Sequence, residues 1–259
     1  MLCASHNIVS STTARTVNSK PDYGYDAPYA LIAFAVLGTL AMAAAVVALI
    51  RERTPVAISL APYAAFFLAN AMSFLYTTRR GKFRVWQTIL DGLSLRGNER
   101  VLDVGCGRGA VLVAVAHRLT TGRATGIDVW RAHDQSGNAR DVTLRNASLE
   151  GVQDRIDVET ADMRALPFEA ATFDVVVSSL AIHNISANAD RARAVSEVWR
   201  VLKPGGRLAI ADIRATRLYA DTLHALGATA VARRRLGWRF WWGNPMASTT
   251  LLTASKPGG

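Results

Sequence analysis

Residues 101–109 read VLDVGCGRG, and this stretch decides the fold. Its first four residues form a short apolar run that is typical of a buried strand. Gly105, Gly107 and Gly109 then form a turn, and residues 110–119 have the composition of a helix. Glycine lets a backbone come close to a ligand that any Cβ would displace. A strand, a glycine turn and a helix in this order begin a nucleotide-binding α/β unit.

Two aspartates accompany this turn. Asp103 lies two residues before Gly105, and Asp128 ends a second predicted strand in the stretch GIDVW. A carboxylate at Asp103 would oppose a pyrophosphate, but it suits a cofactor that carries an ammonium group. Asp128 can accept hydrogen bonds from both hydroxyls of a ribose, as an acid does in a nicotinamide site too. Because Gly105-x-Gly107-x-x-Ala110 also fits the dinucleotide pattern, a nicotinamide-dependent oxidoreductase stays open as an alternative.

Five segments extend the pattern along the chain. They are VLDVGCGRG, GIDVW, ADMRALPF at 161–168, FDVVVSSLAIHNI at 173–185 and EVWRVLKPGGRLAIADI at 197–213. In this order and spacing they resemble class I S-adenosylmethionine (SAM)-dependent methyltransferases, and most closely the branch of ubiquinone/menaquinone-biosynthesis and small-molecule methyltransferases. The resemblance covers residues 81–256. It implies an α/β fold with a doubly wound, Rossmann-like sheet of seven strands, and SAM as the cofactor.

The resemblance also implies which residues hold SAM. Asp103 would bind the methionine ammonium group, directly or through water. The methionine part and the sulfonium would lie against a set of small residues, namely Gly105, Cys106, Gly107, Gly109, Ser178 and Ser179. The nucleoside would meet a second set: Asp128 on the ribose, Val129 or Trp130 on the adenine face, and Asp162 and the backbone N–H of Met163 on the adenine edge.

His183 is the candidate catalytic residue. It follows the fourth predicted strand, where an acceptor would face the methyl group, and histidine titrates near neutral pH. Methyl transfer requires no acid or base unless the acceptor loses a proton, so His183 could instead line the pocket or order the loop with Asn184. In the polar stretch after the second strand, Asp134, Gln135 and Asn138 could close over the cofactor, contact the acceptor or form a solvated connector. No metal site is expected.

Two apolar segments without charge, 27–50 and 54–78, precede this domain. Each is longer than the roughly 20 residues that a helix needs to cross a bilayer. Arg51, Glu52 and Arg53 separate them and predict a tight polar turn. The sequence thus divides into a disordered tail at 1–26, a transmembrane helical hairpin at 27–78 and a methyltransferase domain at 79–259. A signal peptide and a pair of soluble core helices are the alternatives for the apolar segments.

Charge suggests how the chain meets a membrane. The cluster Arg79, Arg80, Lys82 and Arg84 follows the second segment and marks the cytoplasmic side, which predicts a two-span cell-membrane protein with a cytoplasmic catalytic domain. The net charge of +10 favours anionic partners. Arginines mixed with tryptophans at 233–242 suit a lipid interface, while single-stranded nucleic acid or a lid over the substrate are alternatives.

The leading interpretation is methyl transfer from SAM to a small acceptor, which could be lipophilic, at the membrane. The fourth predicted strand is not followed by the Asn/Asp-Pro-Pro-Tyr/Phe pattern of amino-directed nucleic-acid methyltransferases, so nucleic acid is disfavoured as a partner. A non-catalytic SAM-binding protein remains the other alternative beside the oxidoreductase. The sequence favours no particular acceptor atom and no oligomeric state.

Overall fold

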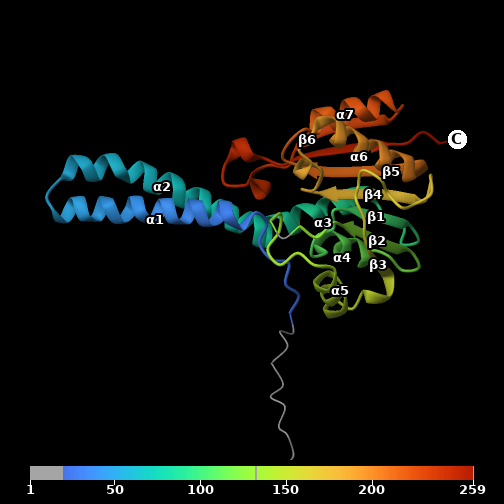
Figure 1. Ribbon diagram of the computed structural model, residues 1–259, viewed down its shortest axis with the longest axis horizontal. Coiled ribbons are helices and arrows are strands. Elements are labelled where there is room, and N and C mark those ends of the chain that lie inside the picture. The colour runs from blue at the N-terminus through green and yellow to red at the C-terminus, as the bar shows by residue number, and fades with distance from the viewer. Residues whose placement is uncertain (1–19, 132, 259) are drawn as a thin grey trace, which may run out of the picture.

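Seven strands form one sheet in the order β3-β2-β1-β4-β5-β7-β6 (Figure 1). The computed structural model describes residues 20–131 and 133–258. The strands are β1 (Arg100–Val104), β2 (Arg123–Asp128), β3 (Ile156–Thr160), β4 (Phe173–Ser179), β5 (Leu202–Asp212), β6 (Thr229–Arg235) and β7 (Thr250–Ser255). The first five run parallel, and β7 is antiparallel to both of its neighbours. This is the doubly wound, Rossmann-like α/β sheet that the sequence predicts.

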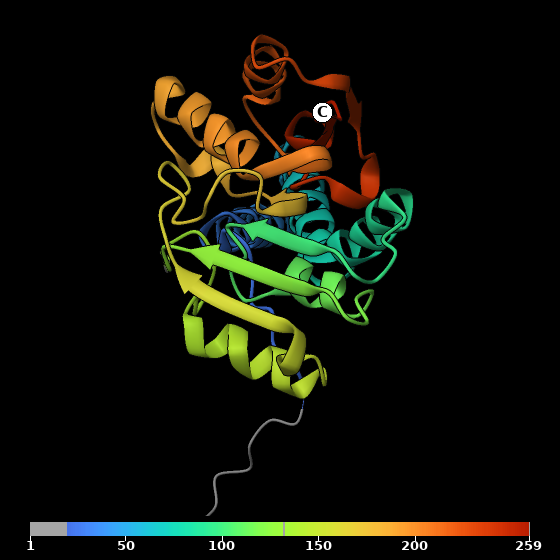
Figure 2. The same ribbon diagram turned by 90° about the vertical axis from the view of Figure 1, so that its right-hand side faces the viewer.

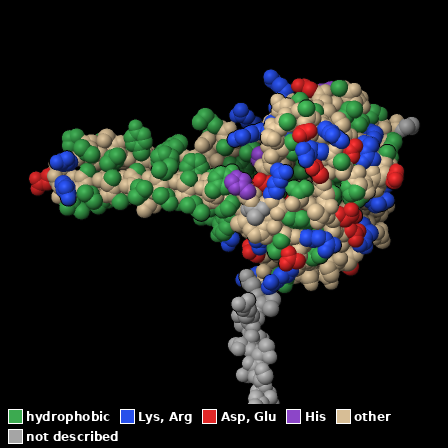
Figure 3. All heavy atoms as spheres, viewed as in Figure 1, with side chains coloured by type: hydrophobic (Ala, Val, Ile, Leu, Met, Phe, Trp, Pro, Cys, Tyr) green, Lys and Arg blue, Asp and Glu red, His purple; other side chains and the backbone are tan. Residues whose placement is uncertain are grey.

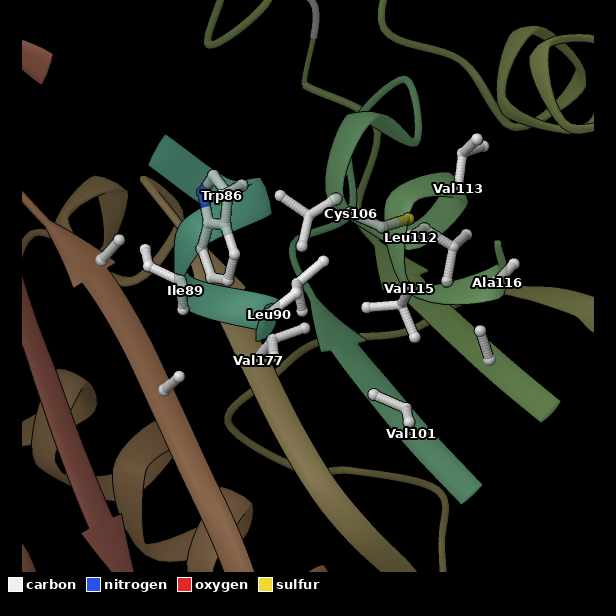
Figure 4. Packing of buried hydrophobic residues seen from close by; sticks show 14 of the residues in the cluster. Trp86, Ile89, Leu90, Val101, Cys106, Leu112, Val113, Val115, Ala116 and Val177 are labelled. Carbon is white, nitrogen blue, oxygen red and sulfur yellow. The ribbon is translucent and has the colours of Figure 1, made fainter. Parts of the chain in front are cut away.

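Helices cover both faces of the sheet (Figure 2). They are α3 (Lys82–Leu93), α4 (Ala110–Ala116), α5 (Arg140–Leu149), α6 (Asn188–Val201) and α7 (Thr216–Ala225). Side chains alternate along a strand, so Val101 of β1 joins a buried cluster with α3 and α4, while Leu102 joins the cluster with α6 and α7. In the first cluster, Trp86 and Leu90 of α3 pack beside Leu112 of α4 (Figure 4). Asp103 follows Val101 by two and shares its face of β1.

The two apolar segments form an antiparallel hairpin, α1 (Pro28–Ile50) and α2 (Thr54–Tyr76), that projects from the domain (Figure 1). A turn at Arg51 and Glu52 joins them, as the sequence predicts, and Pro55 occupies the first turn of α2, where it removes no helical hydrogen bond. Small residues let the two helices approach closely, since Gly38, Ala45, Ala48, Ala57, Ala64 and Ala71 are buried, and Leu68 packs against Gly38. Most of the large apolar side chains point outward.

The hairpin and the domain share one helix. A π-helical turn at Thr77–Gly81 connects α2 directly to α3, so the chain from Thr54 to Leu93 has no loop. The sequence predicts an amphipathic helix after the second apolar segment, and α3 buries one face through Trp86 and Ile89. That this helix continues the hairpin was not predicted.

Residues 20–26 differ from the predicted disordered tail, because they pack along the domain. Asp22 forms an ion pair of 2.8 Å with Arg108, and the Tyr23 hydroxyl donates to Glu150. Residues 1–19 of the predicted tail lie outside the described residues. A smaller difference concerns the helix predicted at 110–119, which ends at Ala116.

Candidate functional site

A cavity of about 750 Å³ lies at the carboxyl ends of β1, β2 and β4. β1 pairs with β2 on one side and with β4 on the other, so the loops after β1 and β4 leave the sheet in different directions. This strand-order reversal is where open α/β sheets bind their ligands. Most residues that the sequence proposes for cofactor binding line this cavity, namely Asp103, Gly105, Cys106, Gly107, Asp128, Val129, Asp162, Met163 and Ser179.

Two positions of the glycine turn, Gly105 and Gly107, leave no room for a side chain. Gly105 and Gly107 have φ values of 75° and 52°, in the left-handed region that favours glycine. A Cβ on Gly105 would overlap the Cβ of Ala181, and one on Gly107 would lie 2.5 Å from Oε1 of Gln135. The backbone N–H groups of Gly105 and Cys106 both donate to the carbonyl of Ile127, which ties the turn to β2. The turn therefore presents a fixed, bare backbone to the cavity.

Asp103 is a buried carboxyl group that lacks a partner. It is 1% exposed, and among the described residues neither of its carboxylate oxygens has a hydrogen-bond partner. Burial, and next the negative charge of Asp128, raise the pKa of Asp103 to about 8. An unpaired buried carboxylate is costly, and a ligand cation placed beside it would remove that cost. The arrangement is thus suited to an ammonium group.

Asp128 is held at the tip of β2 by three donors. Its Oδ2 accepts the N–H of Gly107 at 2.9 Å, and its Oδ1 accepts the N–H of Trp130 at 2.7 Å and Nδ2 of Asn138 at 3.3 Å. A carboxylate offers about four lone-pair sites, so acceptor capacity remains. The carboxylate is therefore fixed in place and still able to accept from ligand hydroxyls.

The predicted adenine side is only partly assembled. Val129 and Met163 line the cavity, whereas the indole of Trp130 is absent from its lining and donates to Oγ1 of Thr160. Val129 and Trp130 are the two residues predicted for the adenine face, and only Val129 lines the cavity. Asp162 lines the cavity but forms an ion pair of 2.6 Å with Arg164, which lowers the pKa of its carboxyl group.

Besides Trp130, Ser178 and Gly109 are the predicted cofactor residues that are absent from the cavity lining. The Ser178 hydroxyl is buried and donates to the carbonyl of Val104, because successive residues of β4 face opposite sides of the sheet. Ser179 faces the cavity and accepts from Nε1 of Trp86 at 2.9 Å. Gly109 precedes α4 as its N-cap residue, outside the cavity lining.

His183 lines the cavity and lies against a buried acid. Its Nδ1 lies 2.6 Å from Oδ1 of Asp212, a fully buried residue at the end of β5. The other carboxylate oxygen accepts the backbone N–H of His183 and the Tyr219 hydroxyl. Burial and the charge of Asp212 raise the pKa of Tyr219, so its hydroxyl stays protonated and donating. Sequence reasoning missed Asp212, although an aspartate that ends a strand, as Asp103 and Asp128 do, was a usable signal.

A second group of cavity residues comes from the N-terminal segment and the hairpin. Asp26 lies at this border, where its carboxylate contacts Lys82 at 2.5 Å, the Thr78 hydroxyl at 2.8 Å and Nε2 of Gln135 at 3.0 Å. Apolar residues of α1, α2, α3 and the loop before β7 complete this side: Ala27, Ala30, Phe34, Phe74, Trp86 and Trp242. No motif in the sequence points to them, because they reach the cavity only through the packing of the hairpin on the domain.

Comparison with known proteins agrees with this geometry. Residues 102–210 match a family described as a methyltransferase domain. In this range the chain is similar to methyltransferase domains, and its sheet has the Rossmann-like fold of class I SAM-dependent methyltransferases. The chain is also 34% identical to a ubiquinone/menaquinone biosynthesis C-methyltransferase, UbiE, of Ruegeria sp. (strain TM1040), over 51% of this chain and 50% of that protein.

A 27-O-demethylrifamycin SV methyltransferase of Amycolatopsis mediterranei is also 34% identical, over 52% of this chain and 46% of that protein. The chain thus spans about half the length of the curated relatives that it matches. Among solved structures, the [4+2]-cyclase SpnF has a TM-score of 0.57 at 22% identity, over 68% of this chain and 82% of that one. A SAM-dependent methyltransferase from Aquifex aeolicus has a TM-score of 0.51 at 19% identity, over 66% and 88%. At these identities the structures support the fold alone.

SAM is the cosubstrate of this class, and the cavity fits it. The unpaired carboxyl group of Asp103 matches the ammonium group of SAM, and Gly105 and Gly107 line the cavity with backbone alone. Asp128 keeps acceptor capacity for a ribose. The same features make a pyrophosphate a poor ligand beside Asp103, which favours SAM over the nicotinamide alternative.

Proposed function

We propose that this protein transfers a methyl group from SAM to a small lipophilic acceptor at a membrane. The observation that carries the methyl-transfer part is the unpaired, buried Asp103, which lines one cavity with Asp128 and the glycine turn. Asp103 would hold the ammonium group, the backbone of Gly105 and Gly107 would line the methionine chain, and Asp128 would accept from the ribose hydroxyls. Val129 and Met163, with the carboxylate of Asp162, would form the adenine side.

The chain's own contribution to the reaction is mainly positioning. SAM supplies a methyl carbon that its sulfonium already activates, so alignment with the acceptor and exclusion of water provide much of the acceleration. His183 is the residue that could accept a proton from the acceptor. Since its Nδ1 faces Asp212, its Nε2 would face the cavity, and the carboxylate would stabilise the ring when it becomes charged.

The membrane part of the proposal is supported by the composition and exposure of the hairpin. Only 11% of the most hydropathic stretch of α1 is buried, and 22% of that of the helix that contains α2. Large apolar side chains cover the outside, and charged groups gather at the tip (Figure 3). A soluble hairpin has the opposite distribution, with its large apolar side chains buried. Small residues at the contact between the two helices are typical of helix pairs in lipid. At about 1.5 Å per residue, 23 residues reach across a hydrocarbon core of roughly 30 Å.

A lipid surface would also have a place to bind at the root of the hairpin. Arg79, Arg80 and Arg84 are exposed there, where they would meet anionic headgroups. Trp238 is 54% exposed and stacks on Tyr76 at 5.2 Å, as aromatic residues do at membrane interfaces. We infer that the hairpin spans the cell membrane twice and that the catalytic domain lies on the cytoplasmic side.

Labelled SAM tests the activity directly. The full-length protein in detergent is incubated with [methyl-³H]SAM and extracts of the source organism, and label is expected in an extract component only when active protein is present. Heat-inactivated protein is the control. If SAM binds but no label is transferred from any soluble or membrane extract, the protein is a SAM-binding protein without this activity, and the proposal is wrong.

Extraction and labelling test the location. The protein should stay in the membrane pellet after alkaline carbonate and dissolve in detergent. In a Cys3→Ser background, an impermeant maleimide added to intact cells should label Arg53→Cys at the hairpin tip and leave Glu169→Cys in the domain unlabelled. Recovery of the protein in the carbonate supernatant, or labelling of Glu169→Cys alone, would contradict the two-span orientation.

A further inference from the structure

The cavity that contains the glycine turn extends to the root of the hairpin. Its far wall includes Ala27, which directly precedes α1, Ala30 and Phe34 of α1, Phe74 of α2 and Trp242 of the loop before β7. Ala30 and Phe34 are four residues apart, so they share one face of that helix. Because Ala27 and Ala30 have small side chains, the start of α1 leaves room beside the helix instead of filling it.

The side chains of this wall are apolar, and the charged residues nearest to it, Asp26 and Lys82, are paired with each other. The rings of Phe74 and Trp242 pack edge to face at 4.9 Å. Nε1 of Trp242 already donates to Oγ1 of Thr249, and Nε1 of Trp86 donates to Ser179, so both indoles present apolar surface. A nucleoside needs polar partners, which lie at the other end of the cavity around Asp128. The hairpin end therefore suits a hydrocarbon group rather than a second polar one.

The same stretch of α1 also carries the surface that faces outward. Tyr29 lines the cavity yet is 57% exposed, and its ring stacks on His133 at 4.8 Å. Ile32 and Val36, on the next turns, are 61% and 49% exposed. The same first turns of α1 thus carry both the cavity wall and the apolar outer surface of the hairpin. With that surface in lipid, a hydrocarbon chain could reach the cavity without crossing water.

We propose that the acceptor is a membrane lipid whose hydrocarbon chain lies on the root of the hairpin, against Ala30, Phe34 and Trp242, and enters from the bilayer. This inference rests on the proposed methyl transfer. The reacting end of the lipid lies at the end of β4, near Ser179 and His183. A lone pair of the acceptor atom forms the new bond to the methyl carbon, and the sulfur–methyl bond breaks with its electrons kept by sulfur. S-adenosylhomocysteine leaves, and any proton lost by the acceptor passes to His183 or to water.

Replacing a small residue of the wall by a large one tests this site. Ala30→Trp places an indole where the chain would lie, and Ala43→Trp is the matched control, because Ala43 is exposed on α1 beyond the cavity lining. Each protein, in nanodiscs of total lipid from the source organism, receives [methyl-³H]SAM and the water-soluble extract, and label is counted in the organic and aqueous phases. The native protein and Ala43→Trp should label the organic phase. Ala30→Trp should lose about tenfold or more of that label and keep its SAM affinity.

A second variant keeps the test informative if Ala30→Trp does not fold. Phe34→Ala removes a contact instead of adding bulk, and it should raise the KM for the lipid about tenfold with little change in the Kd for SAM. Label that enters only the aqueous phase, or equal lipid labelling by Ala30→Trp and Ala43→Trp, would overturn the lipid site and leave methyl transfer intact. Bound SAM without label in either phase would instead refute the proposed function, and the lipid site with it.

Discussion

Replacing Asp103 by asparagine removes the ionisable group from the cavity and almost no volume. With a pKa of about 8, the carboxyl group is about nine-tenths protonated at pH 7, so binding of an ammonium group must first remove a proton. That step costs about 1.4 kcal/mol at pH 7. A buried charged hydrogen bond contributes about 3 kcal/mol when one partner is removed. The difference, about 1.6 kcal/mol, predicts a loss of SAM affinity of about 15-fold in Asp103→Asn at pH 7.

Titration calorimetry in buffers of different ionisation enthalpy measures the affinity for SAM and the number of protons released when SAM binds. The native protein should release close to one proton per SAM at pH 7, and its affinity should rise as the pH approaches 8. Asp103→Asn should release none and lose that rise. Asp157→Asn, at an exposed ion pair with Arg123 at the opposite end of the sheet, serves as control. The same affinity and proton release in both variants would refute the ammonium role of Asp103.

Further outcomes follow from the same site. Asp128→Ala should weaken SAM binding about a hundredfold by calorimetry, since two charged hydrogen bonds are lost; unchanged affinity would remove Asp128 from the site. Gly105→Ala should abolish SAM binding, whereas Gly151→Ala, with a similar φ of 69° and no atom within 4 Å of its Cβ, should keep SAM binding and lose about 1–2 kcal/mol of stability. In SAM-free protein, the raised pKa of Asp103 makes the folded state lose stability as pH rises from about 4 to 8, so the Tm advantage of Asp103→Asn should grow over that range. If His183 accepts a proton, Asp212→Asn should shift the pH–rate profile without changing the Kd for SAM; an unmoved profile would leave His183 a lining residue.

The core of the fold follows from local patterns in the sequence. The stretch 101–109 fixes a strand and a turn because its apolar run and its glycines act over a few residues, and the observed β1 and α4 begin within one residue of the prediction. Strand β4 and the later part of β5 follow for the same reason, since each is a short apolar run, whereas β6 reads TAVARRR and is not such a run. Asp103 and Asp128 come together because parallel strands end at one edge.

Long-range packing explains what the sequence did not reveal. That Phe34 and Trp242 line one cavity depends on how α1 meets a loop more than 200 residues later, and no periodicity encodes that contact. Asp212 was overlooked because its partner, His183, lies on a different strand end. Ser178 and Ser179 were indistinguishable as neighbours, and only the pleat of β4 decides which of them faces the cavity.

The loop-free course of the chain from Thr54 to Leu93 has a mechanical consequence. A protein tied to a bilayer by a flexible linker can rotate and sample the water above it. Here Trp86, which donates a hydrogen bond to Ser179 in the cavity, belongs to the same continuous helix as the second apolar segment. With that helix embedded, the cavity would stay at one height and one tilt above the leaflet, and the search for an acceptor would be confined to two dimensions.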